Sequence, residues 1–303
     1  MWWLGLWMVA CGDDSADDAM GLDSAASSTT ASSSSTTAPG STTRDASTGP
    51  DPDGTGGTTN STGSTGPDDE GNDESTGSTG GEEIDQLDVL FIGNSHTYLD
   101  DIPETDLPLL IADLALSRGK TLVVDSVAEP FRSLEQHWID GEASELIALG
   151  GWDLVVLQER YQPSVDDPAL TLEYAELFAA EIEAAGADPM VYVLWARDDE
   201  LEVQPAIIDN AMMVADAIGA ELVPVGPAWA SIRADYPTMV LAQDDPQSHA
   251  NRRGAYLSAT VFYGALFLDD PVGLPAGTIL DMDPTAAEAE LLQTAAAGAL
   301  AEF

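Results

Sequence analysis

The sequence predicts an α/β domain over residues 85–303, with a doubly wound, parallel five-stranded sheet flanked by helices. Three observations favour this class. Short runs of Val, Leu and Ile lack polar alternation, which is typical of strands buried on both faces. Segments with the apolar period of a helix separate these runs. Proline stands where helical segments begin and glycine where they end. Strands that alternate with helices in this way indicate a parallel sheet.

The five apolar runs are the predicted strands. They cover residues 87–92, 121–127, 154–157, 190–195 and 222–225. The first run stops at Gly93 and is followed by Asn94 and Ser95. Ligand sites of doubly wound sheets form at the carboxyl ends of the strands. We therefore expect Ser95 at the functional edge of the sheet.

Six segments between and after these runs have helical character. They cover residues 103–118, 131–149, 168–185, 203–218, 250–268 and 285–301. Pro103 and Pro168 stand at predicted helix starts, and Gly119, Gly186 and Gly219 stand at predicted helix ends. Residues 224–229, which contain two prolines and a glycine, predict a loop near the end of the fifth strand.

Residues 12–84 have a different composition, dominated by Ser, Thr, Gly, Asp and Pro. A segment with almost no large apolar side chain cannot bury enough surface to offset its conformational entropy. We expect this segment to be a disordered linker that precedes the α/β domain.

An apolar stretch, residues 2–10, precedes Cys11, the single cysteine of the chain. Nine residues are too few to span a bilayer as a helix, but they match the hydrophobic region of a signal peptide. Ala10 directly before Cys11 resembles the lipobox of bacterial lipoproteins, which implies a lipidated Cys11 and a membrane anchor at the cell surface or in the periplasm. The alternatives are an uncleaved hydrophobic N-terminus and cleavage without lipid.

The net charge of −45, from 54 acidic and 9 basic residues, argues against nucleic acid as a partner. Phosphate binding needs clustered Lys and Arg. The excess is not confined to the linker, because residues 87–303 hold 38 acids and 8 bases. The folded part is therefore itself acidic, which favours solubility and discourages anionic partners.

A serine nucleophile needs a base, an acid that orients the base, and donors for the oxyanion. His96 is a poor base for Ser95, because adjacent side chains diverge. His137 lies in a helical segment, where a packed histidine is the alternative. His249 is the best candidate, since it follows Asp245 by four residues in a polar, proline-bent loop. The chain order is then Ser, Asp, His.

Gly93-Asn94-Ser95 and the Asp245 and His249 pair resemble the first and last sequence blocks of the SGNH (GDSL-like) hydrolases. The resemblance implies a flavodoxin-like fold and a catalytic triad, with Asp245 or Asp244 as its third member. It also implies an oxyanion hole formed by the N–H of Ser95, the side chain of Gln158 and a second-block N–H. Residues 129–134 correspond to that block and contain no Gly, so Phe131 or Arg132 would donate.

These features predict an exported serine esterase that needs no metal or organic cofactor. Its substrate would be a small-molecule or carbohydrate ester, for example an acetyl ester. Arg197 and Asn94 are candidate substrate-binding residues, although Arg197 could instead pair with the acids that follow it. The alternative is a surface-displayed binding module on the same fold, with little or no catalysis.

Overall fold

The computed structural model describes residues 84–99, 102, 105–276 and 284–303. The predicted signal segment, Cys11 and the predicted linker lie outside the described residues, apart from Ile84, and so does Pro103. None of the helices in the described residues combines the length and the apolar character needed to cross a membrane.

The described residues form a single five-stranded sheet in the order β2-β1-β3-β4-β5, and all neighbouring strands are parallel. This confirms the predicted fold class. The strands are β1 (Gln86–Gly93), β2 (Thr121–Ala128), β3 (Leu154–Leu157), β4 (Asp188–Tyr192) and β5 (Glu221–Val223). Strand β1 pairs with β2 on one side and with β3 on the other, so the strand order reverses around β1. Its carboxyl end, Gly93, lies at the switch point where such folds bind ligands.

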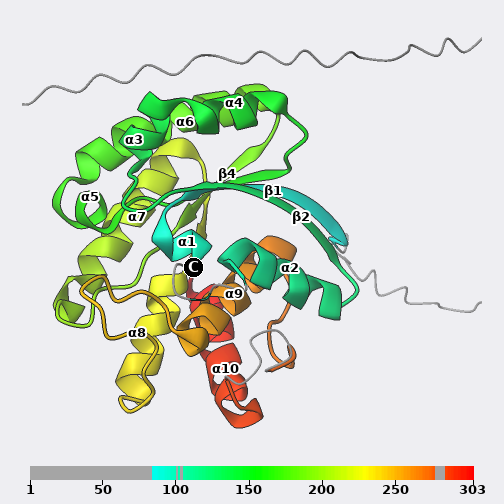
Figure 1. The fold of residues 1–303 in the computed structure, drawn as a ribbon, viewed down its shortest axis with the longest axis vertical. Coiled ribbons are helices and arrows are strands. Elements are labelled where there is room, and N and C mark those ends of the chain that lie inside the picture. The colour runs from blue at the N-terminus through cyan, green and yellow to red at the C-terminus, as the bar shows by residue number, and fades with distance from the viewer. Residues whose placement is uncertain (1–83, 100–101, 103–104, 277–283) are drawn as a thin grey trace, which may run out of the picture. The chain divides into compact units, whose positions relative to one another are not determined.

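Helices cover both faces of the sheet, as Figure 1 shows for α3, α4 and α6 on one side and α2, α9 and α10 on the other. Their bounds are α1 (Ser95–Tyr98), α2 (Leu107–Ser117), α3 (Leu134–Asp140), α4 (Glu142–Leu149), α5 (Tyr161–Asp166), α6 (Pro168–Ala185), α7 (Gln204–Ile218), α8 (Val225–Asp235), α9 (Arg252–Phe267) and α10 (Ala286–Glu302). A short 3-10 turn, Leu201–Val203, precedes α7.

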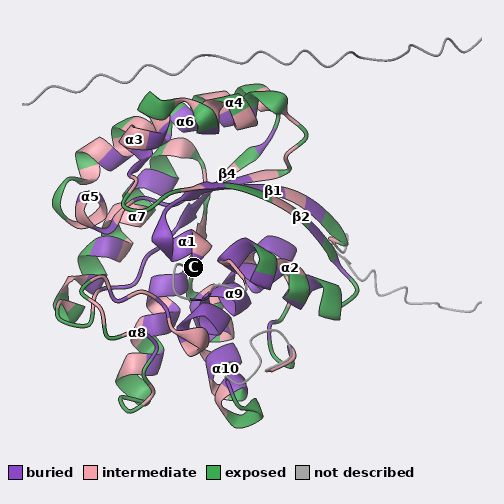
Figure 2. Cartoon of the chain, in the orientation of Figure 1, coloured by how far each residue is buried: buried purple, intermediate pink, exposed green. Residues whose placement is uncertain are grey.

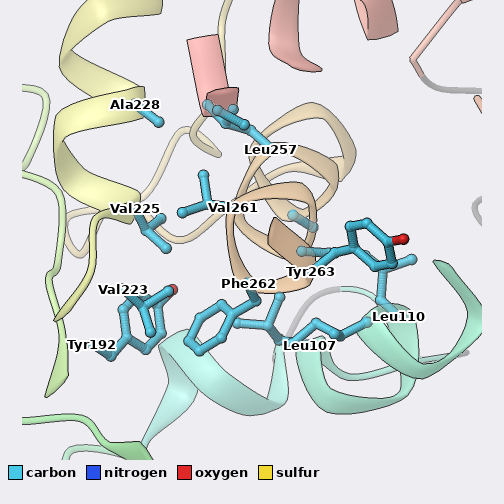
Figure 3. Packing of buried hydrophobic residues seen from close by; sticks show 14 of the residues in the cluster. Leu107, Leu110, Tyr192, Val223, Val225, Ala228, Leu257, Val261, Phe262 and Tyr263 are labelled. Carbon is cyan, nitrogen blue, oxygen red and sulfur yellow. The ribbon is translucent and has the colours of Figure 1, made fainter. Parts of the chain in front are cut away.

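The sheet separates two hydrophobic clusters, because successive side chains of a strand point to opposite faces. Val89 and Phe91 of β1 belong to the cluster with α2, α8, α9 and α10, whereas Leu90 and Ile92 belong to the cluster with α3, α4, α6 and α7. Figure 2 shows α9 almost entirely buried between its neighbours. In Figure 3, Phe262 of α9 lies beside Tyr192, and the two rings meet edge to face with centroids 4.9 Å apart.

Several predicted bounds were wrong, and three of them matter for the fold. Strand β4 ends at Tyr192 rather than at residue 195, because Tyr192 pairs with Val223, the last residue of the short edge strand β5. The predicted helix over residues 131–149 is two helices, since Gly141 has a φ of +83° and ends α3. The predicted loop over residues 224–229 is the start of α8, where a proline in the first turn is tolerated.

Helix α8 also explains why a glycine is required at position 226. A Cβ atom there would lie 2.0 Å from the carbonyl oxygen of Leu194, so the helix start packs directly on the chain leaving β4. This close approach stacks the rings of Trp229 and Trp195, whose centroids are 3.9 Å apart. Segment 193–197 is thereby held in position after the strand has ended.

Candidate active site

Ser95 is the first residue of α1 and follows directly on β1 at the carboxyl edge of the sheet. Asn94 is the helix N-cap, and its side-chain oxygen accepts from the N–H of His96. Gly93 is needed because a Cβ atom there would lie 2.5 Å from Gln158 Oε1 and from Thr97 Oγ1. The turn therefore brings Ser95 out of the sheet at a fixed position, 7% exposed.

The structure brings Ser95, His249 and Asp245 together. His249 Nε2 lies 2.9 Å from Ser95 Oγ, although 154 residues separate the two in the sequence. His249 Nδ1 lies 3.1 Å from Asp245 Oδ1. A carboxylate on Nδ1 fixes the tautomer in which Nδ1 carries the proton, leaving Nε2 free to accept one. Asp245 makes this contact, while Asp244 is exposed in the same loop.

The carboxylate of Asp245 is itself held by its own loop. Its Oδ1 accepts from the N–H of Gln247 at 2.7 Å and its Oδ2 accepts from the N–H of His249 at 3.1 Å. Ser248 takes a φ of +51°, which turns the chain between these two donors. Residues 246–248, between the acid and the histidine, thus form a tight turn around the carboxylate.

Two further contacts fix this loop to the segment that follows β4. The indole of Trp195 donates to the carbonyl of Ser248 at 2.9 Å, and the hydroxyl of Ser248 accepts from the N–H of Asp198 at 3.0 Å. Trp195 was not a candidate site residue from the sequence, although this contact places it against the loop of His249. Its position at the carboxyl end of the predicted strand over residues 190–195 was the available signal.

His96 is not positioned to serve Ser95. Its ring is buried between Trp195 and His249, with centroids 4.9 Å and 5.4 Å away. Burial, followed by the charges of His249 and Arg197, lowers the pKa of His96 to about 3. The ring is therefore neutral, and its Nδ1 can donate to Asn94 Oδ1 at 3.1 Å.

His137 has a packing role in α3. Its Nε2 lies 2.6 Å from the carbonyl oxygen of Gly93, the last residue of β1. The ring is buried, and burial lowers its pKa. A neutral imidazole that donates to this carbonyl fixes the strand end from which Ser95 departs.

Gln158 does not fit the predicted role of oxyanion donor. Its side chain is fully buried, and Nε2 donates to Asn94 Oδ1 at 2.9 Å and to the carbonyl of Glu159 at 2.8 Å. Both amide hydrogens are therefore used. Its Oε1 accepts from the N–H of Asn94 and from Thr97 Oγ1, each at 2.9 Å. Gln158 is a brace between β3 and the nucleophile turn.

Asn94 is also closed to a substrate, contrary to the prediction that it contacts one. Its side chain is 1% exposed, and its Nδ2 donates to the carbonyl of Arg132 at 3.0 Å. Its oxygen is occupied by Gln158 and His96. The residue connects the nucleophile turn with the loop before α3.

Replacing Gln158 with Leu tests whether the residue is a brace. The substitution leaves the buried N–H of Asn94 and the carbonyl of Glu159 without partners, and each such group costs about 1–3 kcal/mol. We expect the free energy of unfolding to fall by about 2–4 kcal/mol in urea denaturation. A variant as stable as the wild type, with only turnover reduced, would instead identify Gln158 as a direct oxyanion donor.

The loop before α3 supplies a better candidate donor. Phe131 has a φ of +60°, the left-handed conformation that favours glycine, and its side chain is exposed. Within the described residues, its N–H makes no hydrogen bond. The N–H of Arg132, the alternative considered from the sequence, is used in a turn to the carbonyl of Glu129 at 3.3 Å.

Glu159, which sequence reasoning did not single out, anchors the same region. Its Oε1 accepts from the N–H of Arg160 at 2.6 Å and from the N–H of Leu134, the first residue of α3, at 3.2 Å. Burial raises the pKa of this carboxyl to about 7. The carboxyl thereby ties the end of β3 to the start of α3.

Comparisons with known proteins give a likeness of fold. The sequence matches no family model and no curated protein. Among solved structures, it is similar to a DUF4886 family protein from Bacteroides uniformis (19% identity, TM-score 0.57, covering 72% of this chain and 95% of that chain). It is also similar to a protein from Slackia heliotrinireducens that is provisionally assigned as an SGNH hydrolase (22% identity, TM-score 0.50, covering 60% and 99%).

These findings show the fold. The chain has an α/β fold similar to that of the two solved structures, and at the carboxyl edge of its sheet His249 contacts both Ser95 and Asp245.

Proposed function

We propose that this protein is a serine esterase with Ser95 as nucleophile, His249 as general base and Asp245 as the residue that orients the base. One observation carries the proposal: Ser95 Oγ, His249 and Asp245 form a continuous line of contacts of 2.9 Å and 3.1 Å. A nucleophile hydrogen-bonded to a base, which is oriented by a third group, is the arrangement that activates a serine hydroxyl.

In the proposed reaction, Ser95 Oγ attacks the ester carbonyl as its proton passes to His249 Nε2. The imidazolium is stabilised by Asp245, and it returns the proton to the leaving alcohol. Water then attacks the acyl-enzyme by the same route and releases the acid. The N–H of Ser95 and the N–H of Phe131 are the proposed donors to the oxyanion.

The proposed substrates are acetyl esters of carbohydrates. A lipid anchor at Cys11, which we propose on the basis of the apolar segment and Ala10 before it, would expose the domain to extracellular polymers. No metal or organic cofactor takes part in the proposed reaction.

Hydrolysis of 4-nitrophenyl acetate by the full-length protein tests the esterase proposal. We expect turnover that an aryl phosphonate abolishes by modifying Ser95, with the label located by mass spectrometry of the digested protein. A protein that neither hydrolyses the ester nor reacts with the phosphonate would contradict the proposal. That result would favour the binding-module alternative, toward which the fully used amide of Gln158 points.

The anchor is tested separately. We expect mass spectrometry of the protein expressed in a bacterial host to show a mature chain that begins at an acylated Cys11. Cys11→Ala should abolish both the acylation and the membrane association. A chain that retains Met1 and an unmodified Cys11 would contradict the proposed anchor, without bearing on the esterase.

A further inference from the structure

Arg197 lies beside the loop of the candidate site and, among the residues that the structure describes, has no acidic partner. The sequence places it directly before Asp198, Asp199 and Glu200, where mutual pairing is the simplest expectation. The structure shows otherwise. Asp198 pairs with Arg233 at 2.5 Å, and Glu200 accepts from the hydroxyl of Tyr161 at 2.9 Å. Among the described residues, no carboxylate lies within ion-pair distance of Arg197.

Neutral groups hold the Arg197 side chain instead. Its guanidinium lies over the ring of Tyr161, 4.2 Å from the centroid, and Nη2 donates to Gln247 Oε1 at 2.6 Å. Gln162, with its amide oxygen turned toward the guanidinium, accepts from both Nη atoms. The Nε hydrogen is buried and has no partner. The side chain is thus fixed in position, and its charge is not neutralised.

These contacts connect Arg197 to the reacting groups. Gln247, which accepts from the guanidinium, also donates its backbone N–H to Asp245 Oδ1. The charge of Arg197 acts on His96 as well, the ring that lies 5.4 Å from that of His249. Arg197 follows β4, which is separated from β1 by β3 in the sheet. It therefore lies at the same carboxyl edge of the sheet as Ser95.

A fixed cation with no counter-ion is unusual in a chain with 54 acids and 9 bases. Removing a guanidinium from water without an opposite charge is costly. Next to the loop that carries Asp245 and His249, such a group is suited to attract an anionic part of a substrate through its charge, with one hydrogen of Nη1 left to donate. The negative charge of the rest of the chain repels anions. Binding of an anionic substrate would therefore depend on this one cation.

We propose that Arg197 is a specificity-determining residue, and that the substrate is an ester whose alcohol part carries a carboxylate. This inference rests on the proposed esterase function and narrows its substrate class to acetyl esters of acidic alcohols, such as acidic sugars. The carboxylate belongs to the alcohol part, since an acetyl group offers no place for it.

Two esters of matched shape test the inference: 4-acetoxybenzoate, which carries a carboxylate on the alcohol part, and the neutral 4-acetoxybenzamide. With the full-length protein, we expect kcat/KM to be higher for the anionic ester. In Arg197→Gln, the ratio of the two kcat/KM values should fall about tenfold, the loss expected for one charged hydrogen-bonding contact. Arg197→Lys keeps the charge but not the planar fork, so an intermediate ratio is expected.

Arg118→Gln is the matched control. This residue precedes β2, at the opposite edge of the sheet from Ser95, and its Nη2 donates to the carbonyl of Val272. The substitution removes one positive charge, as Arg197→Gln does. The ratio of the two kcat/KM values should therefore equal that of the wild type. Thermal unfolding of each variant shows whether the fold is retained.

Calorimetric binding of the alcohol products, 4-hydroxybenzoate and 4-hydroxybenzamide, separates this inference from the esterase proposal. Turnover of both esters without a preference for the anion, and without an effect of Arg197→Gln, would overturn the inference and leave the esterase intact. Binding of the anionic product that Arg197→Gln weakens, without turnover of either ester, would support the anion site and contradict the esterase. Neither turnover nor selective binding would overturn both.

Discussion

Ser95→Ala is expected to reduce kcat/KM for 4-nitrophenyl acetate by about 10⁴-fold or more, to the level left by binding and the remaining oxyanion donors. The physical reason is that the hydroxyl 2.9 Å from His249 Nε2 is the only proposed nucleophile, and alanine removes it without disturbing α1. The cap of that helix is formed by Asn94 and stays in place. Steady-state kinetics of the full-length protein give the measurement.

Ser117→Ala is the matched control for this substitution. Ser117 is exposed at the end of α2, where its hydroxyl donates to the carbonyl of Leu114. Its loss should leave both turnover and stability nearly unchanged. Equal rates for wild type and Ser95→Ala would show that any hydrolysis arises elsewhere, and the esterase proposal would fail.

The second large effect is expected for His249→Ala, which removes the proposed base. Turnover should fall about 10⁴-fold, because the Ser95 hydroxyl then has no group to accept its proton. The double variant Ser95→Ala/His249→Ala should be no slower than either single variant, since residues that act as one unit are not additive. Kinetics of the three variants in parallel give the measurement.

Imidazole supplied in solution distinguishes a lost base from a disturbed fold. The cavity left by His249 is next to Ser95, so added imidazole should restore part of the turnover of His249→Ala and none of that of Ser95→Ala. A His249→Ala variant that stays within tenfold of the wild-type rate would contradict the role of His249. A lowered unfolding temperature together with no rescue would point to loss of the loop held by Trp195.

The sequence was sufficient to predict the sheet and most of its helices, since these depend on local patterns. Buried runs of Val and Leu and the helical period set β1, β3 and α6 at or within one residue of their observed bounds. Errors arose where a distant segment ends an element. Strand β4 stops because β5 is short, and residues 225–229 are helical although the prolines and glycine of residues 224–229 favour a loop.

The candidate site was likewise predictable only in part. The chain alone pointed to Ser95, His249 and Asp245, because their residue types, order and positions at strand ends are visible in the sequence. From the sequence, Gln158 was expected to face the oxyanion and Asn94 the substrate, and the structure buries both side chains instead. An amide can donate to an oxyanion or brace a loop, and only the packing of β3 against the nucleophile turn shows that their amide groups are used within the protein.

The sequence by itself thus determined the α/β class and the edge of the sheet where chemistry is expected, because strand and helix patterns are local and their order dictates a parallel sheet. Only the tertiary structure decided the partners. Whether Asp198 neutralises Arg197 or Arg233, and whether Asp244 or Asp245 meets His249, are choices between groups of equal charge. Contacts between segments separated by many residues make that choice, and they leave Arg197 as a cation next to the loop that carries Asp245 and His249.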